Sequence, residues 1–110
     1  MQSRIDGHIT ILSPSGRLDQ STVAEFQGAV IAIIEGSSPN LVLDMSQVAF
    51  VSSVGLRALV MFNSQAKKDG RKFALAALNQ AVKEVLAIAR LNTVIPSFAA
   101  VDDAVSAQRA

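Results

Sequence analysis

The sequence predicts an α/β fold in which crossover helices connect the strands of a mixed, mostly parallel sheet. Two observations indicate it. Short strand-like runs alternate along the chain with longer segments of helical periodicity. One apolar run, residues 41–45, shows no polar alternation, as expected of a central strand that is covered on both faces. We therefore expect a sheet of four to five strands with about four helices.

Length and composition favour one soluble domain. The chain has 110 residues, so we expect a single domain over residues 1–110. Half of the residues are hydrophobic and the formal net charge is +1, which favours a folded chain without general attraction to nucleic acid or anionic membranes. There is no cysteine, no signal-peptide pattern and no apolar run near the roughly 20 residues of a membrane span. We expect a cytoplasmic protein with no nucleic-acid partner and no direct membrane insertion.

The first elements are a predicted strand and a predicted helix. Isoleucines alternate within residues 8–13, and the Asp-Gly pair at residues 6–7 is a candidate hairpin turn. Apolar residues then recur at helical spacing over residues 22–35. Thr22 and Glu25 fit the capping-box pattern, so we expect this helix to begin at Thr22.

The middle of the chain predicts a loop, a strand and a second helix. Residues 36–40 have loop composition and lead into the apolar run at residues 41–45. After a short loop, helical periodicity covers residues 53–69, and Asp69-Gly70 is a typical helix stop. The apolar stripe of this helix comprises Leu56, Leu59, Phe62 and Ala66.

The last third predicts two more strand and helix pairs. Residues 71–78 form an apolar strand-like run, and Asn79 can cap the helix that follows it. Residues 93–98 predict a short strand interrupted by Pro96, and residues 101–108 predict a final helix. The inward stripe of the helix after Asn79 comprises Val82, Val85, Leu86 and Ala89.

Patterns for catalysis, metal binding and nucleotide binding are missing from the sequence. His8 is the only histidine, and without cysteines it has no partners for a metal site. Neither phosphate-binding glycine motif is present. A nucleophile at Ser52 or Ser53 would lack the G-x-S-x-G context and would need the distant His8 as its base. We expect no catalytic residues, no metal and no cofactor.

The serine pair at the start of the second helix is the most informative feature. Ser53 is well placed as an N-cap, which is its simplest interpretation. The corner between a strand and a helix is also where α/β proteins present functional groups. A phosphate on Ser53 would be tolerated at the positive end of the helix dipole, yet it would add about −1.5 to −2 charges to the surface. The residues alone leave a cap, a phosphorylation site and a nucleophile open.

Two stretches carry a resemblance to a known family. The chain reads "GRLDQST" over residues 16–22 and "LDMSQVAFVSSVGL" over residues 43–56. Both stretches resemble motifs of the STAS-domain anti-sigma factor antagonists. That family has "G-x-L-D" before its first helix. A strand with "L-D-[LM]-S-x-V-x-F" then leads into "[IM]-D-S-[ST]-G-L" at the start of its second helix. The later "NQAVKEVLAIARL" and "VDDAV" also resemble the family. The resemblance implies the STAS fold over nearly the whole chain.

The resemblance also implies a site. Ser53 falls on the family's phospho-acceptor, and Asp19 falls on the aspartate of "G-x-L-D", which contributes to the partner surface. Ser52 stands where many members have Asp, and it is an alternative phosphorylation site. Arg57 and Met61 lie at helical spacing on the polar face of the same helix, adjacent to Ser53. The predicted partner-binding residues are Asp19, Ser52, Ser53, Val54, Gly55, Leu56, Arg57 and Met61.

The implied mechanism is a phospho-switched binding module that is not an enzyme. Unphosphorylated, it would bind a serine-kinase anti-sigma factor of the histidine-kinase-like ATPase fold. Phosphorylation of Ser53 by that kinase would release it, and a metal-dependent serine phosphatase would restore it; when free, it would be a monomer. One alternative is a constitutive STAS subunit of a lipid-trafficking ABC transporter or another membrane complex, in which Ser53 is only a cap. A third hypothesis is a hydrolase, but the sequence supplies no second catalytic group for it.

Overall fold

The computed structural model describes residues 1–36 and 40–109. Within them the chain forms strands and helices in the alternation that the sequence predicts. In chain order the elements are β1 (Gln2–Asp6), β2 (Ile9–Ser13), β3 (Ser15–Leu18), α1 (Val23–Glu35), β4 (Asn40–Asp44), β5 (Gln47–Val51), α2 (Ser53–Lys68), β6 (Phe73–Ala76), α3 (Gln80–Ile88), β7 (Ser97–Phe98) and α4 (Val101–Arg109).

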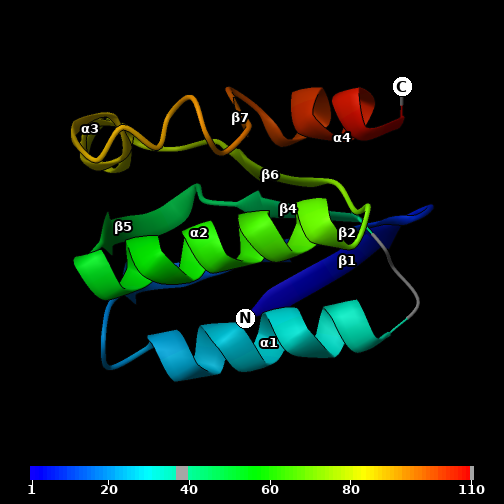
Figure 1. Ribbon diagram of the computed structural model, residues 1–110, viewed down its shortest axis with the longest axis horizontal. Helices are drawn as coiled ribbons and strands as arrows, with labels where there is room; N and C mark the ends of the chain where they lie inside the picture. The colour runs from blue at the N-terminus through cyan, green and yellow to red at the C-terminus, as the bar shows by residue number, and fades with distance from the viewer. Residues whose placement is uncertain (37–39, 110) are drawn as a thin grey trace.

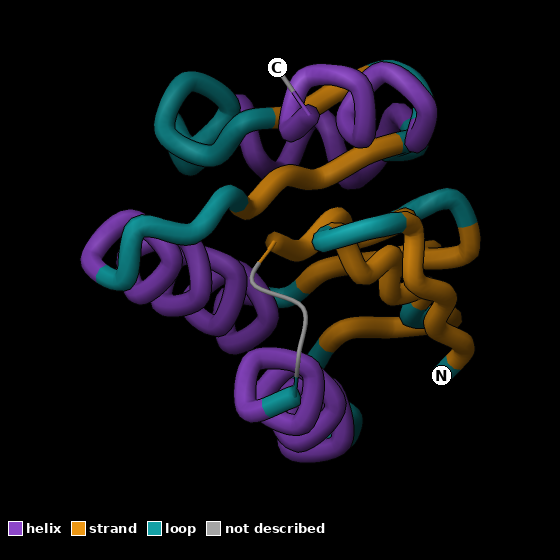
Figure 2. Tube along the Cα trace, turned by 90° about the vertical axis from the view of Figure 1, so that its right-hand side faces the viewer, coloured by secondary structure: helices purple, strands orange, loops and turns teal. Residues whose placement is uncertain are grey.

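A five-stranded sheet forms the middle layer, with the strand order β1-β2-β4-β6-β7. β1 pairs antiparallel with β2, and the other pairs are parallel. Figures 1 and 2 show α1 and α2 together on one side of the sheet and α4 on the other. The central strand β4 serves both layers, because Leu43 belongs to the core cluster beneath α1 and α2 and Val42 to the one beneath α4. The prediction of a central strand covered on both faces is confirmed.

The predicted hairpin and the predicted helix ends are also confirmed at several points. β1 and β2 pair around a turn at Gly7-His8, one residue later than the predicted Asp6-Gly7, and Gly7 has a φ of 65°, which favours glycine. The Asn79 side chain accepts from Val82 N at 2.8 Å and caps α3. Phe62, in the predicted stripe of α2, packs edge to face on Phe26 of α1 with ring centroids 5.7 Å apart.

The sequence-based expectation of a loop between the central strand and the second helix is wrong. Residues Gln47–Val51 form β5, which pairs in parallel with β3 in a separate two-stranded sheet. Val48 and Val51 of β5 are buried, whereas its other three residues are exposed. The strand escapes local pattern recognition because its partner lies about 30 residues earlier in the chain.

Two further expectations need correction. Thr22 occupies the N-cap position of α1, but its side chain makes no capping bond: its hydroxyl accepts from Asp19 N at 3.0 Å and donates to the Arg17 carbonyl at 2.7 Å. The predicted strand over residues 93–98 shortens to β7, because Val94 N and Ile95 N both bond to the Leu91 carbonyl in a turn. The loop expected at residues 36–40 lies mostly outside the described residues.

Among the helices in the described ranges, none is long and apolar enough to cross a membrane.

Candidate partner-binding and phosphorylation site

The start of α2 separates the roles of its two serines. Ser52 has extended backbone angles, and its side-chain oxygen accepts from Gly55 N at 3.3 Å, so Ser52 is the N-cap. The Ser52 carbonyl accepts from Leu56 N at 2.8 Å. Ser53 is the first residue of the helix and is exposed. The expectation that Ser53 caps the helix is wrong, because the chain turns into the helix one residue earlier.

The first turn of α2 is held tightly against the end of β3. Ser52 N donates to the Leu18 carbonyl at 2.9 Å. Gly55 is buried beside it, and a Cβ at this position would lie 2.5 Å from the Leu18 carbonyl oxygen and 3.0 Å from Val51 Cγ1. Only a residue without a side chain allows this approach. The "L" of "GRLD" and the "G" after the serines therefore fix where the helix begins.

The carboxylate of Asp19 is held by its own loop. Its Oδ1 accepts from Ser21 N at 3.0 Å and from Ser21 Oγ at 2.6 Å, and its Oδ2 accepts from Arg17 Nε at 3.1 Å. The hydrogen bond from the Ser21 hydroxyl, followed by that from Arg17, holds the pKa of Asp19 below its ordinary value. Asp19 therefore carries a negative charge at neutral pH in a fixed orientation.

Asp19 and the serine pair line one open hollow of about 440 Å³. They meet because β3 and β5 run parallel, so the residues that follow both strands emerge at the same edge. Among the described residues, none forms a hydrogen bond with the Ser53 hydroxyl. The residues lining the hollow are Asp19, Gln20, Ser21, Ser52, Ser53 and Val54.

The other predicted partner-binding residues lie along α2, outside the lining of this hollow. Gly55 is buried and Leu56 is half-buried against the core, so both position the helix. Arg57 is exposed, and the Met61 side chain is 56% exposed. Arg57 and Met61 thus extend an accessible surface from Ser53 along the helix.

Three residues beside Asp19 were not predicted from the sequence to belong to the site. Ser21 and Arg17 hold its carboxylate, as described above, and the Arg17 guanidinium also lies 4.7 Å from the centroid of the Phe50 ring. Arg17 and Phe50 are cross-strand partners in β3 and β5. The Asp-x-Ser spacing was the available signal, because an aspartate often bonds a residue two positions later. The Arg17 and Phe50 contact depends on a strand pair that the sequence did not reveal.

Groups for metal or acid-base chemistry do not gather at this site. In the described ranges, no three His, Cys, Asp or Glu side chains are placed to hold a metal ion. His8 is exposed in the turn after β1, and it does not line the hollow. The hollow brings the exposed Ser53 hydroxyl and the Asp19 carboxylate to one surface.

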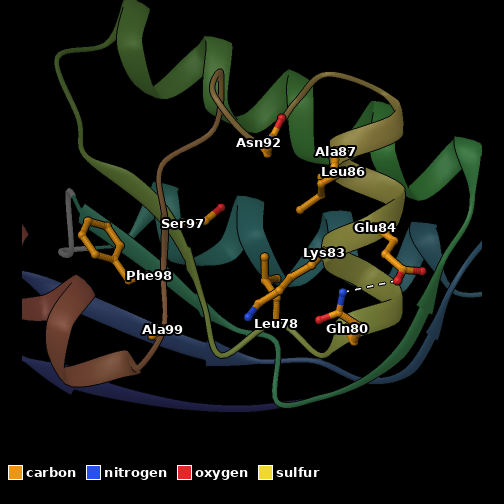
Figure 3. A pocket seen from close by; sticks show the side chains of 10 residues that line it. All are labelled: Leu78, Gln80, Lys83, Glu84, Leu86, Ala87, Asn92, Ser97, Phe98 and Ala99. Atoms are coloured by element: carbon orange, nitrogen blue, oxygen red, sulfur yellow. Dashed lines mark hydrogen bonds between the residues drawn. The ribbon is translucent and has the colours of Figure 1, made fainter.

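A separate hollow of about 410 Å³ lies between α3 and the segment leading into β7. Figure 3 shows Leu78 and Leu86 turned into it, with Gln80 and Glu84 on the helix surface joined by a 3.3 Å hydrogen bond. The Phe98 ring points away from the other labelled side chains. This hollow shares no lining residue with the site at Ser53.

The arrangement of a mixed five-stranded sheet with helices on both faces agrees with comparisons to known proteins. The STAS domain family matches residues 1–104. This chain belongs to the STAS domain family. The predicted α/β STAS fold, with its mixed, mostly parallel five-stranded sheet, is therefore confirmed.

Relatives of this STAS domain include antagonists of anti-sigma factors. The anti-sigma-F factor antagonist RsfB of Mycobacterium tuberculosis is 27% identical over 103 residues, which cover 92% of this chain and 82% of RsfB. The crystal structure of an anti-sigma factor antagonist from Mycobacterium paratuberculosis has a TM-score of 0.89 and 28% identity, and the match covers 99% of this chain and 92% of that one.

A third relative extends the likeness of fold. The crystal structure of a candidate anti-sigma factor antagonist from Thermotoga maritima has a TM-score of 0.93 over 99% of this chain and 94% of that one. Its identity is 22%, so it supports the fold alone. The resemblance to anti-sigma factor antagonists seen in the sequence motifs thus extends over the full STAS domain.

Proposed function

We propose that this STAS domain is an anti-sigma factor antagonist whose binding is switched by phosphorylation of Ser53. One observation carries the proposal: Ser52 performs the capping, so the exposed Ser53 hydroxyl is left free of a structural role. A kinase can modify such a hydroxyl without removing a hydrogen bond on which the fold depends. Ser52 is the poorer acceptor for the same reason, because its oxygen already accepts from Gly55 N.

The fold accommodates a phosphate at Ser53. The first N–H groups of α2 have no partner within the helix, and the helix dipole places partial positive charge there. A phosphoryl group on the first helical residue would lie near those donors. We therefore expect phosphorylation to change the surface of the domain and to leave its fold intact.

The hollow explains how a phosphate would alter binding. Asp19, held in its charged form, lines the same hollow as Ser53. Phosphorylation would add about −1.5 to −2 charges beside a fixed carboxylate. A partner surface that accepts one carboxylate would then meet close to three negative charges, and the complex would dissociate. Arg57 and Met61 extend the proposed docking surface along α2.

The proposed partners follow from this role. Unphosphorylated, the domain binds a serine-kinase anti-sigma factor of the histidine-kinase-like ATPase fold and frees that factor's client. The kinase phosphorylates Ser53 with ATP, and a metal-dependent serine phosphatase reverses the reaction. In this scheme the domain acts in the cytoplasm as a ligand and a substrate, it needs no cofactor, and it contributes no catalytic residue. RsfB, a relative by sequence, is named for the same class of role.

Mass spectrometry of the protein purified from its own cells tests the proposal. We expect a phosphate on the peptide that contains Ser53, removed by phosphatase treatment and lost in Ser53→Ala. Ser52→Ala is the matched control and should still be phosphorylated at Ser53. Phosphate found on Ser52 alone would transfer the switch to that residue.

A constitutive role makes the opposite prediction. If the domain were a permanent subunit of a lipid-trafficking ABC transporter or another membrane complex, no phosphate would be found under any growth condition. The wild type and Ser53→Asp would then co-purify equally with the same ATPase or membrane partner. That pair of results would replace the switch by the subunit function.

A further inference from the structure

A second hollow lies at the other end of α2, in a part of the domain that the proposed function does not use. It has a volume of about 240 Å³ and is lined by the last turns of α2 and α4 and by the residues entering β6 and β7. Lys67, on the last turn of α2, lines it and is 14 residues after Ser53, which corresponds to roughly 21 Å along a helix. The two hollows share no lining residue.

The lining of this hollow is cationic. Lys67, Arg71 and Lys72 contribute to it, and no aspartate or glutamate is among its lining residues. Lys72 Nζ donates to the Gln108 carbonyl at 2.9 Å, so this ammonium group already serves the last turn of α4. Lys67 is exposed at the rim. Positive charge that converges on a concave surface favours a small anion.

Two residues of the lining each carry a buried polar atom that is unsatisfied, one a donor and the other an acceptor. Arg71 Nη1, a donor, and Gln108 Oε1, an acceptor, are both buried without a hydrogen-bond partner among the described residues. Gln108 as a whole is only 7% exposed. Leaving such groups unpaired in the interior is costly, and native proteins rarely do so.

Backbone contacts orient the Gln108 amide and fix the backbone position of Arg71. Gln108 Nε2 donates to the Leu41 carbonyl at 3.0 Å, which identifies the other amide atom as the unpaired oxygen. Arg71 follows α2 in a Schellman turn: Arg71 N donates to the Ala66 carbonyl at 2.8 Å, and Gly70 has a φ of 69°. The unpaired donor and acceptor therefore belong to positioned residues.

From these contacts we infer that the hollow binds a small oxyanion that carries a hydroxyl group, with hydrogen phosphate as its simplest form. An anionic oxygen would accept from Arg71 Nη1 and lie near Lys67, and the hydroxyl would donate to Gln108 Oε1. The volume lies below the roughly 300–1,000 Å³ of pockets for drug-sized ligands, so the ligand is small. Phe73 and Phe98 provide an apolar wall for a short carbon chain attached to the oxyanion.

Sulfate supplies the sharpest comparison, because it matches phosphate in shape and charge but carries no proton at neutral pH. We would titrate the ¹⁵N-labelled full chain with sodium phosphate, sodium sulfate and sodium chloride at equal ionic strength, and follow the Gln108 amide and Arg71 Nε–H signals. We expect saturable shifts around these two residues, with phosphate binding at least about fivefold tighter than sulfate. Glycerol phosphate, added in a separate titration, would distinguish a hydroxylated phosphate ester from free phosphate.

A matched pair of variants tests the site without touching the core. Lys67→Glu should weaken phosphate binding by about tenfold or more, whereas Lys68→Glu, which makes the same charge change next to the hollow, should leave it within about twofold. Arg71→Gln should also weaken binding by about tenfold, provided that circular dichroism shows a folded chain. Ser53→Ala should bind phosphate as well as the wild type, which keeps this test independent of the proposed switch.

The inference is overturned by any of three results. Chloride could reproduce the shifts, phosphate and sulfate could bind equally, or Lys67→Glu and Lys68→Glu could behave alike. The first and third would show a general response to ionic strength or surface charge, and the second would show that the hollow does not recognise a hydroxyl group. A titration without saturable shifts at Gln108 and Arg71 would overturn it as well, because water alone would then satisfy the two atoms.

Discussion

Gly55 of α2 lies against the carbonyl oxygen of Leu18, closer than any side chain would allow. A Cβ at residue 55 would be 2.5 Å from that oxygen. The same carbonyl accepts from Ser52 N at 2.9 Å. One oxygen at the end of β3 therefore fixes both the cap and the first turn of the helix that carries Ser53, and it brings that turn to the edge where Asp19 emerges.

Substitution of Gly55 should destabilise the domain. We expect Gly55→Ala to lower the free energy of unfolding by about 1–3 kcal/mol, because the strain of the forced contact outweighs the better helix propensity of alanine. Gly28→Ala in α1 is the control: its Cβ would meet nothing within 4 Å, so it should add roughly 0.5–1 kcal/mol. Urea unfolding measures both. Equal stability of Gly55→Ala and the wild type would contradict the packing described here.

The two serines should respond differently to alanine. Ser52→Ala removes the oxygen that accepts from Gly55 N and should cost about 1 kcal/mol of stability. Ser53→Ala removes an exposed hydroxyl and should change stability by less than about 0.5 kcal/mol. Thermal unfolding of the two variants side by side is sufficient. The reverse order of stabilities would return the capping role to Ser53.

A negative charge at Ser53 should abolish partner binding and preserve the fold. Ser53→Asp places a carboxylate at the N-terminus of α2, where it should be neutral or stabilise by about 0.3–1 kcal/mol. Its affinity for the serine kinase that co-purifies with the unphosphorylated chain should fall by about tenfold or more, because the new charge lies beside Asp19. Ser53→Asn, of equal size and without charge, is the control in calorimetric titration. Equal binding by Ser53→Asp and Ser53→Asn would argue against an electrostatic switch.

The acid dependence of stability should report on Asp19. The pKa of Asp19 in the folded chain lies below the ordinary value of 3.8. Its contribution to stability is therefore complete above the ordinary pKa, and it is lost as the pH falls through the lower pKa of the folded chain. The stability difference between the wild type and Asp19→Asn should therefore shrink on acidification below that value. Unfolding experiments over a series of acidic pH values check this, and a difference that grows on acidification would contradict the sign.

The origin of that pKa shift can be divided between two neighbours. The hydrogen bond from the Ser21 hydroxyl is the larger cause and the bond from Arg17 the smaller one. Ser21→Ala and Arg17→Gln should thus each raise the pKa of Asp19 toward its ordinary value. Carboxyl ¹³C chemical shifts of Asp19 across the titration measure both. A larger effect of Arg17→Gln would show that the ion pair dominates.

Most of the secondary structure followed from local patterns. The apolar run of β4, the hairpin turn at Gly7 before β2 and the cap of α3 at Asn79 each depend on residues close in sequence. β5 did not follow, since its strand character depends on pairing with β3. The start of α1 at Thr22 did follow, but its capping box did not, because the Thr22 hydroxyl bonds back to Arg17 and Asp19. Local patterns cannot register a partner that the fold supplies from elsewhere.

The features of the candidate site also divide into those that the sequence indicates and those that only the fold decides. The sequence by itself indicated the STAS family, and it placed Asp19 and Ser53 in two short motifs that resemble that family. Only the tertiary structure decided that Ser52 is the cap, that Ser21 and Arg17 hold the Asp19 carboxylate, and that Arg71 and Gln108 share a cationic hollow at the far end of α2. The physical reason is that caps, pKa shifts and unpaired buried atoms depend on distances of a few ångströms between groups, and these distances exist only once the chain has folded.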